Sequence, residues 1–286
     1  MAQLRNCILA AGLALTTALT ATAPYADIGK LESVIAARPE QDRARDDQRH
    51  PAQTLTFFQV EPGMTVAEAL PGGGWYTRIL ANYLGAEGTL YGVNYTDRMW
   101  PLFSFATEEW VASRIAATGK FAAQVKEFTD NGVQARGFTF NTVPSEAVGT
   151  VDRVLMIRAL HNLNRMEATA GTRSQALSAV RSMLKDDGLV GVVQHRAPES
   201  ASDEWADGNK GYLKQTAVIE MFQDAGFTLV GTSEINANPK DKPGAEDIVW
   251  RLPPSLRTSQ DDPELRKELT AIGESDRMTL LFAKAP

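Results

Sequence analysis

The sequence predicts an α/β protein in which strands and helices alternate along the chain. Three observations carry this prediction. An apolar run at 65–70, a glycine turn and an amphipathic run at 75–84 follow one another as strand, turn and helix. Gly88 then introduces a second strand at 89–94, which completes a βαβ unit. Residues 151–157 are nearly continuously apolar, as the buried strands of parallel sheets are.

The same alternation continues to the end of the chain. We expect further helices at 52–59, 172–184 and 212–225, a mostly helical segment at 97–128, and further strands at 134–143, 189–195, 227–235 and 278–284. Residues 27–50 are charged and mostly helix-forming, and His50-Pro51 ends them, which predicts a helical arm packed on a domain of residues 51–286. Within that domain, about 236–276 are rich in Pro, Asp and Asn and are predicted as an ordered insertion with little regular structure.

Composition limits the kinds of partner. The 286 residues suffice for one large α/β domain or two small ones, and 43% of them are hydrophobic. The formal net charge of −6 gives no general basic surface, so we expect no nucleic-acid partner. No apolar run after the N-terminus is long enough to span a membrane.

The first 26 residues have the pattern of a secretory signal peptide. One positive charge, Arg5, precedes an apolar stretch of small residues, and Ala21 and Ala26 are the candidate cleavage positions. The single cysteine, Cys7, leaves with this segment, so the mature chain has no disulfide or thiolate chemistry. We therefore expect a periplasmic or secreted protein with no stable membrane insertion after signal removal.

The glycine turn is the first candidate binding site. Pro71 is followed by Gly72, Gly73 and Gly74 directly before a helix. Glycines let a ligand approach the backbone, and the N-terminus of the next helix presents free N–H groups and a positive dipole end. Such a turn is typical of nucleotide-type binding, although a glycine cluster by itself also fits a flexible loop.

With these elements assigned, the chain resembles the class I S-adenosylmethionine-dependent methyltransferases over roughly residues 50–235 and the last strand. The segment 65–77 is similar to the family's first motif, 151–163 to its fourth, and 183–193 to its later turn and strand. A narrower resemblance, to a group of predicted exported (periplasmic) methyltransferases, rests on Arg49-His50-Pro51, Pro71 to Thr77, Asn94-Tyr95 and Leu160-His161-Asn162.

The resemblance implies a Rossmann-like, doubly wound, seven-stranded, mostly parallel sheet with an antiparallel last strand. It implies S-adenosylmethionine as cofactor and methyl transfer to a small-molecule substrate; it leaves the oligomeric state open. Glu68 would contact the amino-acid end of the cofactor, directly or through water. The other implied cofactor-binding residues are Pro71, Gly72, Gly73, Gly74, Trp75 and Asn94. Trp75 would pack over the ligand or be buried in the core.

Two positions depart from the family pattern. Asn94 stands where the family has an acid that holds the ribose hydroxyls, and Thr139-Phe140-Asn141 lacks the acid that reads the adenine amino group. An amide still bonds a hydroxyl but without a negative charge. The alternative function is therefore a non-catalytic periplasmic small-ligand-binding protein that keeps the methyltransferase fold.

The three histidines fall at the ends of predicted elements. A neutral His161 would serve as the catalytic general base, or it caps its strand end by a hydrogen bond; both remain open. For His50 and His195 we favour the structural role. No metal site is predicted, because no His-x-x-x-His or comparable spacing occurs.

Overall fold

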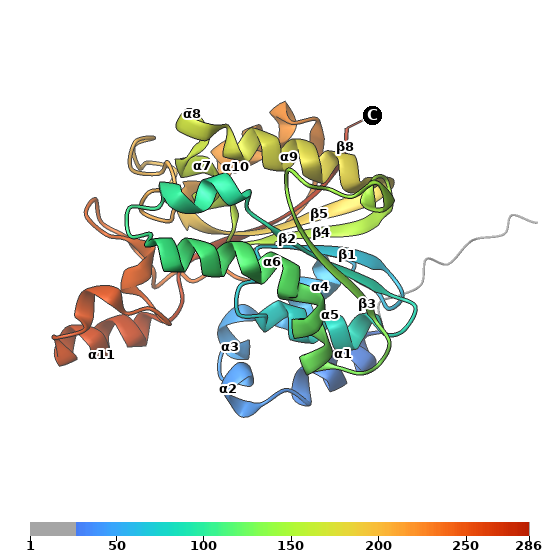
Figure 1. The fold of residues 1–286 in the computed structure, drawn as a ribbon. Helices are drawn as coiled ribbons and strands as arrows, with labels where there is room; N and C mark the ends of the chain where they lie inside the picture. The colour runs from blue at the N-terminus through green and yellow to red at the C-terminus, as the bar shows by residue number, and fades with distance from the viewer. Residues whose placement is uncertain (1–26, 286) are drawn as a thin grey trace, which may run out of the picture.

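A central sheet runs through the molecule with helices on both faces (Figure 1). The computed structural model describes residues 27–285, so the predicted signal peptide at 1–26 lies outside the described residues. In the described chain, seven strands follow the order β3-β2-β1-β4-β5-β8-β7, and the short β6 pairs with the end of β5. The strands are β1 (Thr65–Ala69), β2 (Thr89–Asn94), β3 (Gln134–Thr139), β4 (Val151–Ile157), β5 (Leu184–Ala197), β6 (Leu213–Lys214), β7 (Phe227–Ser233) and β8 (Arg277–Lys284).

The pairing confirms the predicted fold class. β1 lies parallel to both β2 and β4, β2 to β3, and β4 to β5. The last strand, β8, is antiparallel to both of its neighbours, β5 and β7. The strand order reverses direction between β1 and β4, which is the position where open α/β sheets of this kind bind ligands at their carboxyl ends.

Helices α1, α4, α5 and α6 pack on one face of the sheet, and α7, α9 and α10 on the other (Figure 1). The α-helices are α1 (Ile28–Ala36), α2 (Glu40–Arg43), α3 (Asp46–Arg49), α4 (Pro51–Phe57), α5 (Trp75–Leu84), α6 (Glu108–Phe128), α7 (Leu160–Arg165), α8 (Glu167–Ala170), α9 (Thr172–Met183), α10 (Gln215–Asp224) and α11 (Pro263–Ile272). Short 3-10 helices are η1 (Asp97–Leu102), η2 (Ser145–Ala147), η3 (Val249–Arg251) and η4 (Arg257–Ser259). No helix within residues 27–285 is long and apolar enough to cross a membrane.

Local sequence patterns set most of these elements. The predicted helix at 75–84 and the predicted strands at 89–94 and 151–157 have the bounds of α5, β2 and β4. The residues predicted as a helical arm contain α1, α2 and α3, and His50, with φ 43°, joins α3 to α4.

One expectation was wrong in detail. The insertion at 236–276 contains a ten-residue helix, α11, because Asp262 caps the N–H of Leu265 and Pro263 begins the first turn. The segment 97–128 is mostly helical, as predicted. It consists of η1 and α6, and the Thr107 side chain caps the start of α6 at Trp110 N.

Candidate functional site

The chain leaves β1 through a turn whose backbone is open on one side. Leu70 and Gly72 have φ values of 55° and 58°, and Gly74, with φ 78°, is the N-cap of α5. A Cβ at Gly73 would meet no atom within 4 Å, whereas one at Gly74 would come 2.8 Å from the Phe128 ring. The backbone at Gly73 therefore faces space that a ligand can enter, beside the positively polarised first turn of α5.

Glu68, the acid of the predicted motif, is buried in β1. Its carboxyl group accepts a hydrogen bond of 2.6 Å from the Thr77 hydroxyl of α5. Burial raises the pKa of Glu68 to about 8, and the bond from Thr77 opposes this only in part. The group is therefore mostly protonated at neutral pH. A ligand cation placed beside it would favour the charged form and release the proton.

The ends of β2 and β3 carry neutral polar groups. Asn94 Nδ2 donates to Thr118 Oγ1 at 2.9 Å, and Asn94 pairs with Thr139 between the two parallel strands. The Thr139 hydroxyl donates to Asn141 Oδ1 at 2.6 Å. The Asn94 side chain is thus held at the strand end where the resemblance implies a ribose contact, and none of these four side chains brings a negative charge.

Pro71 and Trp75 flank the glycines, and Trp75 also contacts the N-terminal helices. Its Nε1 donates to the backbone oxygen of Asp42 at 3.0 Å. The guanidinium carbons of Arg38 and Arg49 lie 4.7 and 4.5 Å from its ring centroid. Trp75 therefore joins α2 and α3 to the glycine turn. A contact of Pro71 or Trp75 with a cofactor stays a prediction.

His161 lies in the first turn of α7, just after β4, and is buried. Its Nδ1 is 3.2 Å from Gln194 Oε1, while Gln194 Nε2 donates to the backbone oxygen of Gly211 at 3.0 Å. This bonding assigns the ring proton to Nδ1 and leaves Nε2 as the acceptor. Burial lowers the pKa of His161 to about 4, so the ring is neutral at pH 7 and a weak base. Its catalytic role stays a prediction.

The histidines at the ends of β4 and β5 lie together. The ring centroids of His161 and His195 are 5.4 Å apart, and the Trp250 ring of η3 is 5.9 Å from His161. His195 Nδ1 is 2.6 Å from Ser275 Oγ, a hydrogen bond that agrees with the structural role expected for this residue. Burial, followed by the proximity of His161 and Arg158, holds the pKa of His195 well below its usual value.

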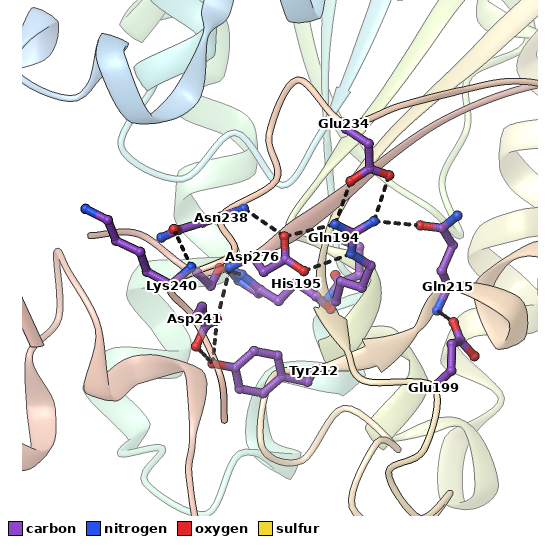
Figure 2. A network of polar contacts seen from close by, with 12 residues as sticks. Gln194, His195, Glu199, Tyr212, Gln215, Glu234, Asn238, Lys240, Asp241 and Asp276 are labelled. Atoms are coloured by element: carbon purple, nitrogen blue, oxygen red, sulfur yellow. Dashed lines mark hydrogen bonds and ion pairs between the residues drawn. The ribbon is translucent and has the colours of Figure 1, made fainter. Parts of the chain in front are cut away.

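A polar network ties the insertion to this edge of the sheet (Figure 2). Asp241 accepts hydrogen bonds from the Tyr212 hydroxyl at 3.1 Å, from Arg251 at 2.7 Å and from the backbone N–H of Asp276 at 3.0 Å. Arg196, at the end of β5, donates to Asp276 at 2.8 Å. The hydrogen bond from Tyr212 and the ion pair with Arg196 therefore hold the insertion at this edge of the sheet, whereas the buried Asp241–Arg251 pair lies within the insertion.

Several residues around His161 were not expected from the sequence. Gln194, Tyr212 and Trp250 surround the histidines but come from separate parts of the chain. The one available signal was Gln194 itself, a polar residue at the end of an apolar strand that is fully buried in the fold. Within residues 27–285, no group of three or more His, Cys, Asp or Glu side chains is arranged to hold a metal ion.

Comparison with known proteins extends the fold assignment. No family model and no curated protein matches the sequence. Among solved structures, the [4+2]-cyclase SpnF is similar with a TM-score of 0.52 and 14% identity, over 90% of this chain and 92% of that one. A second similar structure is a chain from a Haloferax volcanii complex between the Trm112 methyltransferase activator and a protein assigned as a methyltransferase. The TM-score is 0.50 and the identity 17%, over 90% of this chain and 98% of that one.

These likenesses and the strand order show that the chain has the Rossmann-like fold found among methyltransferases. At such identities the likeness concerns the fold alone. A cyclase stands among the similar structures, so the fold does not determine the reaction, which has to be argued from the site.

Proposed function

We propose that the protein binds S-adenosylmethionine at the glycine turn and transfers its methyl group to a small-molecule acceptor. The observation that carries this proposal is the open backbone at Gly73, beside the N-terminus of α5 and at the reversal of strand order. Leu70 and Arg158, which directly follow the neighbouring strands β1 and β4, both have positive φ, and such strain concentrates at functional sites.

The residues of the turn fit the cofactor. The backbone of Gly72 to Gly74 would hold its amino-acid end, with Glu68 close to the amino group, and Asn94 would bond a ribose hydroxyl. The cofactor supplies an electrophilic methyl group. The protein supplies alignment and exclusion of water, and Nε2 of His161 would accept the proton that the acceptor releases. Because its pKa is low, His161 would pass that proton on rather than retain it.

A second function is favoured by the neutral ends of β2 and β3. Asn94 and Thr139 offer hydrogen bonds but no charge to the ribose and adenine. This chemistry suits a protein that keeps the fold and binds another small ligand without methyl transfer.

Calorimetric titration of the mature protein with S-adenosylmethionine and S-adenosylhomocysteine separates these functions. Both ligands carry an ammonium group, so we expect their binding at pH 7 to release a proton from Glu68. The buffer takes up that proton, and the measured heat of binding should therefore change with the ionisation enthalpy of the buffer. The Glu68→Gln variant should bind both ligands with a heat that does not depend on the buffer. The control variant Glu87→Gln, at an exposed position, should show the same buffer dependence as the parent protein. Undetectable binding of both ligands would exclude the methyltransferase function.

We further propose that the protein is exported, on the strength of the pattern in its first 26 residues. The intact mass of the native protein should correspond to a start between Thr22 and Asp27. Recovery of a chain that still contains Cys7 from the cytosol would contradict export.

A further inference from the structure

One carboxylate lies among three guanidinium groups where α3 meets the start of β8. Glu274 Oε1 accepts hydrogen bonds from Arg45 Nε at 2.7 Å and from Arg49 Nε at 3.1 Å. Its Oε2 accepts from Arg277 Nη1 at 3.0 Å. The side chains of Glu274, Arg49 and Arg277 are 6%, 2% and 4% exposed. Three positive charges therefore share one negative charge, and of these four side chains only that of Arg45, 27% exposed, is in substantial contact with solvent.

A fourth guanidinium belongs to the same group. Arg158 follows β4 in a left-handed backbone conformation, and its backbone N–H donates to the Val193 oxygen of β5 at 2.7 Å. Within residues 27–285 its guanidinium has no hydrogen-bond partner. Burial lowers the pKa of Arg158 to about 10; the nearby Glu274 raises it and Arg277 lowers it. Arg158 is therefore charged at neutral pH and lies within electrostatic range of the other charges.

The group also has hydrogen-bond donors left over. Arg49 Nη1 and Arg277 Nε are buried and have no partner within the described chain. Arg38 Nη1 and Arg251 Nε are also buried without a hydrogen-bond partner in that part of the chain, but Arg38 and Arg251 each have a carboxylate of their own, Asp46 and Asp241. Arg45, Arg49 and Arg277 share the one carboxylate of Glu274. Buried donors and charges without partners are costly, so native proteins rarely keep them unless a ligand, an ion or a bound water uses them.

We propose that Arg49, Arg158 and Arg277 form a binding site for an oxyanion, the carboxylate or phosphate group of a small molecule. Arginine suits this task because its planar fork of N–H groups matches both oxyanions. The site lies between the two parts of the candidate functional site. Arg49 stacks on Trp75 beside the glycine turn, and Arg277 pairs with His195 across β5 and β8.

A cavity opens beside the group at Glu274 and Arg277. It has a volume of about 270 Å³ and is also lined by Asp47, His50, Asn238 and Lys240, whereas Arg49 and Arg158 do not line it. Since a water molecule occupies about 30 Å³ in the liquid, this space is large enough for a phosphate or a small carboxylate.

Anion binding at this site does not depend on methyl transfer. A role in methyl transfer rests on the proposed function. In that case the arginines would bind the anionic group of an acidic methyl acceptor and keep that group away from the methyl donor. Because the anion is measured alone, failure of this inference and failure of cofactor binding give different results.

The test uses the mature protein with sodium phosphate and sodium succinate, and with sodium chloride at equal ionic strength. Arg158→Gln removes a charged group that has no protein partner, so it should fold. Arg181→Gln is the matched control, because Arg181 is also partly buried but lies at the end of α9, on the amino-terminal side of the sheet. Binding is followed by calorimetry and by thermal unfolding, and folding by circular dichroism.

We expect phosphate or succinate, but not chloride, to bind and to raise the unfolding temperature; the preferred anion identifies the ligand's acidic group. Arg158→Gln should weaken that binding about tenfold, from the loss of a charged hydrogen-bond donor, and Arg181→Gln should leave it unchanged. Arg49→Lys keeps the charge but loses the free Nη1 donor, so it should weaken binding several-fold. If neither anion binds better than chloride, or if the Arg158 and Arg181 variants bind equally, the inference is wrong.

Discussion

The two halves of the sheet's carboxyl edge use different chemistry. At β1, β2 and β3 the protein presents backbone N–H groups, an open glycine turn and neutral side chains such as Asn94 and Thr139. At β4, β5 and β8 it presents two buried histidines and an excess of guanidinium groups around Glu274. The first half would hold a ligand by shape and dipoles, and the second by charge. Two ligands bound side by side, one of them anionic and lying at the second half, would fit this difference in chemistry.

The largest effect that separates the halves is the direction of their pH dependence. Glu68 has a pKa of about 8 when folded, so the stability that it contributes is present below its ordinary pKa of 4.5 and is lost as pH rises to 8. His161 has a pKa of about 4, so its contribution is present above 6.5 and is lost as pH falls to 4. The changes should be about 5 and about 3 kcal/mol.

Urea unfolding of the parent, Glu68→Gln and His161→Asn between pH 4 and 9 measures these changes. Glu68→Gln should flatten the stability profile on the alkaline side, and His161→Asn should flatten it on the acid side. Profiles of both variants parallel to that of the parent would show that neither group is buried as described.

The charged half should also depend on its single carboxylate. Glu274→Gln leaves Arg45, Arg49 and Arg277 without a countercharge, so the free energy of unfolding should fall by about 3 kcal/mol. Phosphate should restore part of this loss if the anion site exists. Glu246→Gln, with a side chain that is 98% exposed, should change stability by less than about 0.5 kcal/mol. Equal stability of the two variants would contradict the charge imbalance.

The neutral half should depend on free space at its turn. Gly73→Val places a branched side chain where the structure has no atom within 4 Å of a Cβ, so the protein should still fold. The side chain would occupy the space of the ligand, and affinity for S-adenosylmethionine should fall about a hundredfold, a loss of about 3 kcal/mol in binding free energy. Gly119→Val is the matched control, since a Cβ there also meets no atom and the position is exposed on α6. Undiminished affinity of the folded Gly73 variant would move the site elsewhere.

The smallest expected effect concerns the missing acid. In Asn94→Asp the Thr118 hydroxyl can donate to the new carboxylate, so the side chain should keep its place at the end of β2. A charged acceptor bonds a ribose hydroxyl more strongly, and affinity for S-adenosylmethionine should rise by about 1 kcal/mol. Calorimetry on the two proteins decides this. Equal, measurable affinities would mean that Asn94 does not contact the ribose.

The sequence by itself determined the order of the elements and the glycine turn. Alternating apolar runs, glycines and helix signals act over a few residues, which is why α5, β2 and β4 have their predicted bounds. The helix α11 was missed although its signals, Asp262 and Pro263, are equally local, because the Pro, Asp and Asn content of the insertion suggested irregular structure.

Only the tertiary structure decided the charged half of the edge. Arg49 and Glu274 meet although 225 positions separate them, and Arg158 joins them because β4 pairs with β5, which in turn pairs with β8. The histidines illustrate the same limit, since the sequence placed His161 and His195 at strand ends but not 5.4 Å apart in a buried site. Periodicity and turn chemistry describe neighbours along the chain, whereas the pairing of distant charges follows from the strand order and from the packing of the arm and the insertion on it.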